Sequence, residues 1–85
     1  MRLPVIKQIH GFIKDNDEDF VVEAIEVLEH LTELESLKDE ELDVIGELIS
    51  NMEGALEVDK TIKAGTPEKE AFNGFMKRVL GSIDQ

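Results

Sequence analysis

The chain has 85 residues and no cysteine, so it forms one small domain without disulfides, thiolate metal ligands or thiol redox chemistry. Its 9 basic and 20 acidic residues give a net charge of −11, which argues against nucleic acid as a partner because phosphate binding depends on Lys and Arg. No apolar run could span a membrane and the N-terminus lacks a signal-peptide core, so a cytoplasmic location is expected.

The charge is unevenly distributed along the chain. Residues 1–14 carry three bases and no acid, for a charge of +3. Residues 15–59 carry 17 acids against Lys38 alone, or −16, and residues 60–85 carry five bases against three acids, or +2. This asymmetry predicts basic ends that fold over the acidic middle, or a protein partner with a basic surface. Solubility alone is the simpler alternative.

Four amphipathic helices are predicted, and the first begins at Pro4. Proline is favoured at the start of a helix because the N–H that it lacks would be unpaired there. The apolar residues that follow recur at helical spacing and form one face: Val5, Ile6, Ile9, Phe12 and Ile13. His10 lies at the edge of this face, and the chain is expected to turn at Asp15–Asn16.

The second helix is predicted from Asp17 to Glu35, with Asn16 as its N-cap and acids in its first turn. Val21 and Ile25 flank an apolar stripe that consists of Phe20, Ala24, Val27, Leu28, Leu31 and Leu34. The opposite face is acidic and contains Glu23, Glu26, Glu29 and Glu33. Like charges at this spacing repel one another, which indicates a role in solubility or a positively charged neighbour.

The third helix is predicted to run between an N-cap at Ser36 and a stop at Gly65, over about 42 Å at 1.5 Å per residue. A helix of this length is expected to be the element on which the others lean. It carries two apolar stripes, the first being Leu42, Ile45, Ile49, Met52 and Leu56, the second Val44, Leu48, Ala55, Val58 and Ile62. Together they cover about half of the circumference, which predicts either a central position or burial by a second chain. Asn51 falls within the second stripe and needs a hydrogen-bond partner.

Small residues recur every four positions on the remaining face of this helix, at Gly46, Ser50 and Gly54. Each glycine costs about 1 kcal/mol relative to alanine in a helix interior, so close approach of another helix is one explanation. The alternative is that these residues are incidental and face water. The predicted interaction surface therefore consists of Gly46, Ser50, Gly54, Ile45, Ile49, Met52 and Leu56.

The fourth helix follows the sequence Gly65-Thr66-Pro67, in which Gly65 ends one helix, Thr66 caps the next and Pro67 occupies its first position. A connection of about two residues predicts that the third and fourth helices form an antiparallel hairpin. The apolar face of the fourth helix consists of Ala71, Phe72, Phe75, Met76, Val79, Leu80 and Ile83.

Candidate chemical sites are weak. Asp15, Asp17, Asp19 and Glu26 match four positions of a calcium loop, but Phe20 stands where that loop requires glycine, so helix capping is the preferred interpretation. No Glu-x-x-His pair of the kind that binds two metals is present. No serine has a spacing that suggests a histidine partner, and no glycine-rich phosphate loop follows a strand. Neither an enzyme, a cofactor nor a metal is therefore expected.

The segments LKDEELDVIGELISNMEGALEV, from Leu37, and AGTPEKEAFNGFMKRVLGSID, ending at Asp84, resemble a short bacterial family of unknown function found in Bacteroidetes. The resemblance spans nearly the whole chain and brings no catalytic motif. It implies genes that lie beside thioredoxin and peroxiredoxin genes, and hence an accessory role beside a redox-operon neighbour.

The sequence as a whole predicts an all-α, four-helix, bundle-like domain over residues 1–85. The expected function is that of a non-catalytic interaction or adaptor protein that forms a homodimer through the third helix. The alternative is a bundle that binds a metal or a small ligand. A cavity lined by polar groups around Asn51 would favour the alternative, whereas a filled core with a large apolar contact surface would favour the adaptor.

Overall fold

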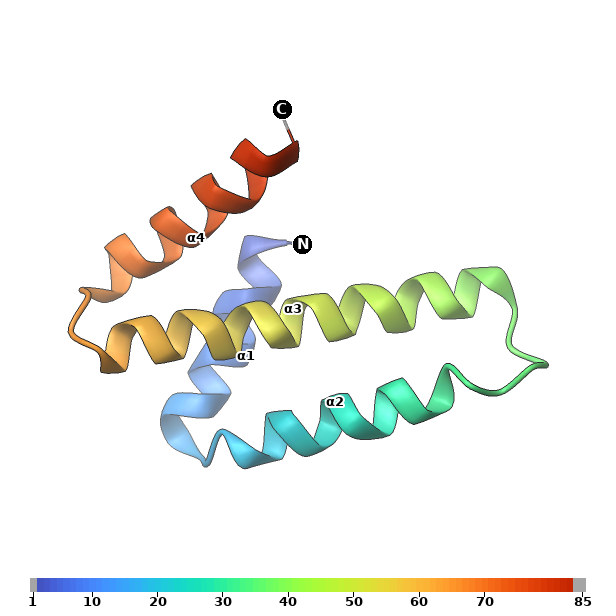
Figure 1. Ribbon diagram of the computed structural model, residues 1–85. Helices are drawn as coiled ribbons and strands as arrows, with labels where there is room; N and C mark the ends of the chain where they lie inside the picture. Colours follow the sequence, from blue (N-terminus) through green and yellow to red (C-terminus); the bar gives the residue numbers. More distant parts are fainter. Residues whose placement is uncertain (1, 84–85) are drawn as a thin grey trace.

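Residues 2–83 are described by a computed structural model and form four helices: α1 (Leu3–Asp15), α2 (Asp19–Leu31), α3 (Asp39–Lys63) and α4 (Glu68–Ile83). The long α3 lies at the centre, with α2 and α4 on opposite sides and α1 crossing it obliquely (Figure 1). The helix pairs that pack most extensively all include α3. The predicted all-α fold is thus confirmed, and so is the central position of the third helix.

The predicted cap at Asn16 is wrong, because this side chain closes the helix before it. Asn16 Nδ2 donates to the Phe12 carbonyl at 3.1 Å, at the C-terminal end of α1. The chain then makes a local turn in which Asp17 Oδ1 accepts the backbone N–H of Asp19 at 3.0 Å. Helix α2 therefore begins at Asp19, two residues later than predicted.

The boundary between α2 and α3 also differs from the prediction. Helix α2 ends at Leu31, where the Thr32 hydroxyl donates to the Glu29 carbonyl at 2.6 Å. Continuing it would place further carboxylates at the negative end of the helix dipole, which is unfavourable. Ser36 is not the N-cap of α3; instead the Lys38 backbone N–H donates to Glu41 Oε1 at 3.0 Å, one half of a capping box.

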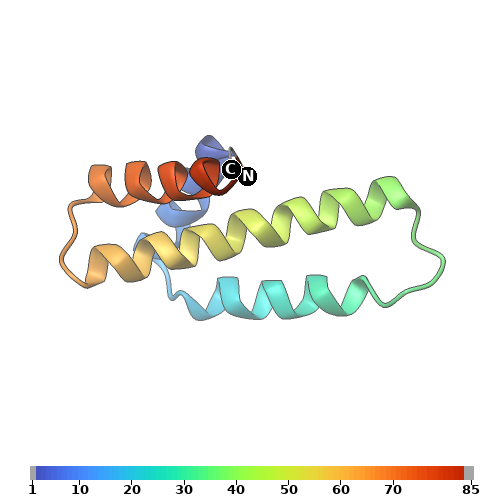
Figure 2. The ribbon, with the colours of Figure 1, turned by 45° about the horizontal axis from the view of Figure 1, so that its top comes forward.

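The turn between α3 and α4 confirms the role of Gly65, which has a φ of +117°. Its N–H donates to the Ile62 carbonyl at 2.9 Å, and the Thr66 N–H donates to the Thr61 carbonyl at 3.3 Å. This pair of bonds is the Schellman arrangement that ends a helix at a left-handed residue. Helix α4 starts one residue later than predicted, with the Pro67 carbonyl accepting the first helical bond. Helices α3 and α4 form the predicted antiparallel hairpin (Figure 2).

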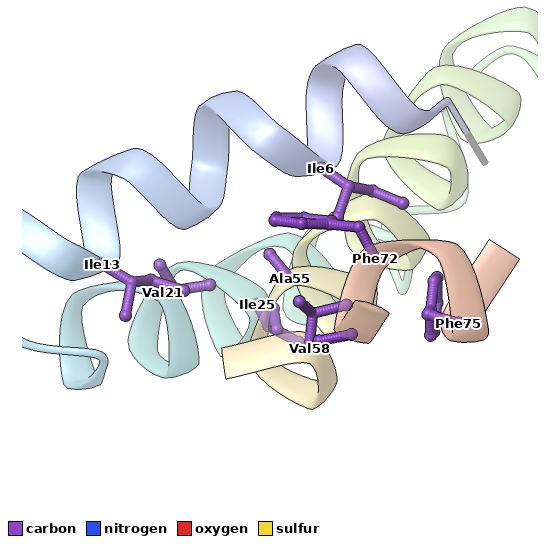
Figure 3. Packing of buried hydrophobic residues seen from close by; sticks show 9 residues of the cluster. Ile6, Ile13, Val21, Ile25, Ala55, Val58, Phe72 and Phe75 are labelled. Carbon is purple, nitrogen blue, oxygen red and sulfur yellow. The ribbon is translucent and has the colours of Figure 1, made fainter. Parts of the chain in front are cut away.

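All four helices contribute to one small core (Figure 3). Its buried apolar members are Ile6, Ile13, Val21, Ile25, Ala55, Val58, Ala71, Phe72 and Phe75. In α2 the buried residues are Val21 and Ile25, which flank the apolar stripe. Ala24 and Leu28 of the stripe are half-buried, whereas Phe20, Val27 and Leu31 are exposed. As a result, α2 leaves most of its apolar surface outside the core.

Candidate functional site

The main candidate site is an apolar surface on α2 and α3 that continues onto the adjoining end of α1. It is called here the apolar face. It consists of six side chains that are 38% to 61% exposed: Phe12, Phe20, Val27, Leu31, Val44 and Leu48. Phe20, Val27 and Leu31 are spaced along α2 so that they lie on one stripe. Leu34, which is also exposed, follows α2 in the loop at the tip of the pair. Soluble monomers rarely expose contiguous apolar patches of more than a few hundred Å², and larger ones often mark interaction sites.

Helix α1 forms a wall along one side of this face. The Phe12 ring meets the Phe20 ring of α2 edge-on, with centroids 5.9 Å apart. Near the other end of α1, Val5 lines a hollow of about 370 Å³ together with Val44 and Leu48 of α3. One flank of α1 therefore contacts the stripe of α2 and faces the second stripe of α3 across the hollow, so the exposed parts of the two helices lie on the same side of the pair as α1.

Acidic residues border the apolar face. Asp43 and Glu47 line the same hollow as Val44 and Leu48, and Glu23, exposed on α2, stands four positions before Val27 and so lies beside the stripe of that helix. These residues belong to the segment 15–59, which carries 17 acids and one base. The face is thus apolar in the middle and negative at its rim. Such a surface suits a partner that brings apolar side chains together with basic ones.

The interaction residues predicted on α3 do not form one continuous exposed surface. Ile45, Ile49, Met52 and Leu56 are half-buried, and the last three pack against the core. Ser50 is half-buried, Gly46 is exposed and Gly54 is buried. Whether a partner touches any of these residues stays a prediction.

The two glycines of this group have opposite surroundings. A Cβ on Gly54 would lie 3.0 Å from Phe75 Cζ and 3.4 Å from Ile6 Cδ1, so Gly54 allows α1 and α4 to approach α3 closely. A Cβ on Gly46 would have nothing within 4 Å. Close helix approach therefore explains Gly54 within the fold of this chain and does not explain Gly46.

Asn51 has the hydrogen-bond partners that its place in an apolar stripe requires. The side chain is 1% exposed; its Oδ1 accepts the Arg2 backbone N–H at 2.9 Å and its Nδ2 donates to the Glu47 carbonyl at 2.9 Å. The amide thus ties the start of α1 to the middle of α3. A buried amide requires hydrogen-bond partners, and those of Asn51 join two helices.

A buried polar cluster around His10 is a feature that sequence reasoning missed. His10, 2% exposed, has Nε2 3.3 Å from Asp59 Oδ1 and Nδ1 3.7 Å from Glu68 Oε1. Its ring also meets Phe72 edge-on at 5.4 Å. The cluster joins α1 to α3 and α4. A signal was present in the sequence, because His10 stands among Ile6 and Ile13 on one apolar face, and Asp59 follows Ala55 by four positions.

Lys63 completes the cluster from the surface. Its Nζ lies 2.9 Å from Asp59 Oδ2 and 3.9 Å from Glu18 Oε1 at the start of α2. The hydrogen bond to Asp59 is the main cause that raises the pKa of Lys63 above its ordinary value of 10.5. The charges of Asp59, Glu18 and Asp17 act in the same direction, and desolvation opposes them. This cation balances one of the two acids around His10.

The chemistry available to these groups is limited by their placement. His10 and Asp59 are closed off from solvent, so the pair holds helices together rather than facing a substrate. Among residues 2–83 no three His, Cys, Asp or Glu side chains are grouped so as to hold a metal ion. Asp19, Phe20 and Glu26, of the calcium-loop pattern, lie within α2. Within the same residues, no helix combines the length and apolar composition needed to cross a bilayer.

Comparisons with known proteins place the chain in a family without assigning it an activity. A search of curated proteins and a search of solved structures both give no significant match. A family model described as a family of unknown function (DUF6952) matches residues 1–84, which is nearly the entire chain. The chain therefore belongs to this family of unknown function, DUF6952.

Proposed function

We propose that this protein is a small non-catalytic interaction module, an adaptor, that forms a homodimer through the apolar face. The observation that carries the proposal is a set of six large, exposed apolar side chains, five of them on α2 and α3 and the sixth, Phe12, on the adjoining flank of α1. An 85-residue domain buries a small core, so association adds burial that the chain cannot achieve alone. Two-fold homodimers are also the commonest oligomers of soluble proteins.

The proposed contact differs in position from the one expected on α3. The expected stripe of Ile45, Ile49, Met52 and Leu56 is already half covered, whereas Val44 and Leu48 of the second stripe are exposed. The dimer in this proposal therefore uses the second stripe of α3 together with the exposed stripe of α2. A further partner with a basic surface, or a redox-operon neighbour as the family resemblance implies, stays a prediction.

The alternative of a metal- or ligand-binding bundle has less support. It would be favoured by a cavity with polar groups converging around Asn51, but this amide is occupied by Arg2 and Glu47. The hollow beside it is open to the surface and is shared with Val44 and Leu48 of the apolar face. These observations favour a protein contact surface.

The test is the mass of the protein in solution, measured by sedimentation equilibrium at micromolar concentrations. The wild type is expected to be a dimer, and the double variant Leu31→Gln/Val44→Gln a monomer. Burying such a side chain contributes about 1.5–3 kcal/mol, so losing two should weaken the dimer by a factor of roughly 100 or more.

The matched control is Val22→Gln, also on α2. Val22 is 40% exposed but lines a different hollow with Glu53 and Lys60 on the opposite side of the pair. Circular dichroism should show all variants to be folded. A monomeric wild type, or a dimer that Val22→Gln disrupts and the double variant does not, would refute the proposal.

A further inference from the structure

The way in which the two copies fit together can be derived from the shape of the apolar face. We infer that the second copy inserts its own α1 into the corner between α1 and the α2–α3 pair of the first. This inference rests on the proposed homodimer and adds its geometry. It identifies an apolar stripe on the flank of α1, formed by Val5, Ile9 and Phe12, as the contact at the centre of the dimer.

The corner has a floor and a wall. The floor is the part of the apolar face that α1 leaves uncovered, and the wall is the flank of α1 that carries Phe12 and Val5. Residues 39–48 of α3 run for about 15 Å beyond the part covered by α1, and a helix with side chains is about 10–12 Å across. The floor therefore has room for one more helix beside α1.

The stripe on the wall has the spacing of a helix contact surface. Val5, Ile9 and Phe12 are separated by four and three residues, so they lie in one row along α1. This row is distinct from the row of Ile6 and Ile13 that is buried against the core. Val5 and Ile9 are half-buried and Phe12 is 46% exposed, so the row is incompletely covered within one chain.

Two such corners interlock about a two-fold axis that runs along α1, between the two copies. Rotation about this axis turns one floor to face the other and places the two α1 helices side by side in the gap. Because the axis is parallel to α1, the two helices run in the same direction. Each residue of the row then faces its own counterpart, so that Ile9 meets Ile9 of the second copy, as an isologous contact requires.

The charges favour this arrangement. Residues 1–14, which include all of α1 except Asp15, carry three bases and no acid, whereas residues 15–59, which supply the floor and its rim, carry 17 acids and one base. In the interlocked dimer each copy brings this acid-free segment, whose Lys14 and Lys7 contact Glu68 and Phe72 of their own chain, beside the acidic rim of the other. A contact between two floors alone would bring acid against acid, which is unfavourable.

Gly11 gives a separate indication that the second copy packs closely against α1. It lies in the middle of α1, where a glycine lowers helix stability, yet a Cβ at this position would have nothing within 4 Å. Gly11, Pro4 and Gln8 lie on the side of α1 away from the buried Ile6 and His10. In the dimer this side rests on the floor of the second copy, where a missing side chain allows close approach.

Disulfide cross-linking tests the geometry directly, because the chain has no cysteine of its own. Ile9→Cys and Val5→Cys should each form a disulfide-linked dimer under mild oxidation, as non-reducing electrophoresis would show. The control is Lys7→Cys, on the other flank of α1, where Lys7 Nζ lies over the Phe72 ring of α4 at 5.8 Å. It should cross-link at a rate roughly tenfold lower or less, because disulfides require Cα atoms about 4.4–6.8 Å apart.

The outcomes separate this inference from the proposed function. A dimer in which Lys7→Cys links faster than Ile9→Cys and Val5→Cys would overturn the geometry and leave the homodimer intact. Linking of Ile9→Cys without Val5→Cys would indicate antiparallel α1 helices and would also overturn it. A wild type that stays monomeric at micromolar concentrations would remove both proposals together.

A pair of glycine variants gives a second test that needs no oxidation. Gly11→Leu should raise the dimer dissociation constant by roughly tenfold or more, because overpacking separates the α1 helix from the opposite floor. Gly74→Leu is the matched control, since Gly74 is also a helical glycine with nothing within 4 Å of a Cβ, although it is exposed and Gly11 is half-buried. Equal dissociation constants for the two variants, measured by sedimentation, would overturn the inference.

Discussion

The two halves of α3 differ in what surrounds them, although they belong to one regular helix. All its buried residues lie from Asn51 to Asp59, in the half that α1 and α4 cover. Residues 39–50 contain no buried residue, and Val44 and Leu48 are exposed there. Figure 1 shows this half extending with α2 beyond the other two helices. An apolar stripe on a helix therefore indicates a surface suited to burial, and the covering chain need not be the same one.

The largest effect that can test this difference is expected from a comparison of one buried aromatic residue of the core with one exposed aromatic residue of the apolar face. Phe75→Ala should lower the free energy of unfolding by about 3–5 kcal/mol, because it leaves a cavity between α3 and α4. Phe20→Ala removes a ring that is 58% exposed and should cost about 0.5–1 kcal/mol. Urea denaturation measures both values.

These two substitutions should be made in the Leu31→Gln/Val44→Gln background, so that dimerisation does not contribute. A cost for Phe20→Ala that equals the cost for Phe75→Ala would mean that the apolar face is buried within a single chain. The distinction between the packed core and the exposed apolar face would then be lost.

The second prediction contrasts the two glycines of α3. Gly54→Ala should destabilise the protein by about 1–3 kcal/mol, since the added methyl group would lie 3.0 Å from the Phe75 ring. Gly46→Ala should instead stabilise it by up to about 1 kcal/mol, because no neighbour is near and alanine favours the helix. Thermal melting of the two variants gives the signs. The same sign for both would contradict the difference between the halves.

The helices themselves could be predicted from local signals. The proline near the start of α1, the charged first turn of α3 and Gly65 each act within a few residues, so periodicity and capping preferences reveal them. The errors at Asn16 and Ser36 arose where two helix ends compete for the same short segment. Asn16 could cap the following helix or close the preceding one, and the sequence does not rank these options.

The candidate site was harder to predict because it depends on the rotation of α2 about its own axis. The stripe of Phe20, Val27 and Leu31 was visible in the sequence, but so were Val21 and Ile25 about 100° away around the helix. Only the packing of α2 on α3 decides which set is buried. The partner of His10 likewise depends on how α1 crosses α3. This crossing brings His10 together with Asp59, which lies 49 positions later in the sequence.

The third prediction concerns the acidic middle segment of the chain, residues 15–59. The melting temperature should rise with added sodium chloride, because residues 15–59 carry a net charge of −16 and screening limits its repulsion to about 8 Å near physiological ionic strength. Calcium at matched ionic strength should add nothing to this increase. A melting temperature that does not respond to sodium chloride would show that repulsion is already balanced, and saturable stabilisation by calcium would point to the acidic segment before α2.

The smallest effect is expected at Lys63, where α2 and α3 meet the cluster around His10. Its pKa is raised above 10.5 by the hydrogen bond to Asp59, so the folded state binds this proton more tightly than the unfolded state. The stabilisation is therefore fully present below pH 10.5 and is lost as the pH rises through the higher pKa of the folded protein.

Comparing the wild type with Lys63→Gln removes the contribution of all other titrating groups. The wild type should melt higher than this variant by a constant margin from neutral pH to just below 10.5, and the margin should shrink at higher pH. A margin that already falls between pH 7 and 9 would show that a different group carries the effect, and the ion pair of Lys63 with Asp59 would not be what balances the buried carboxylate.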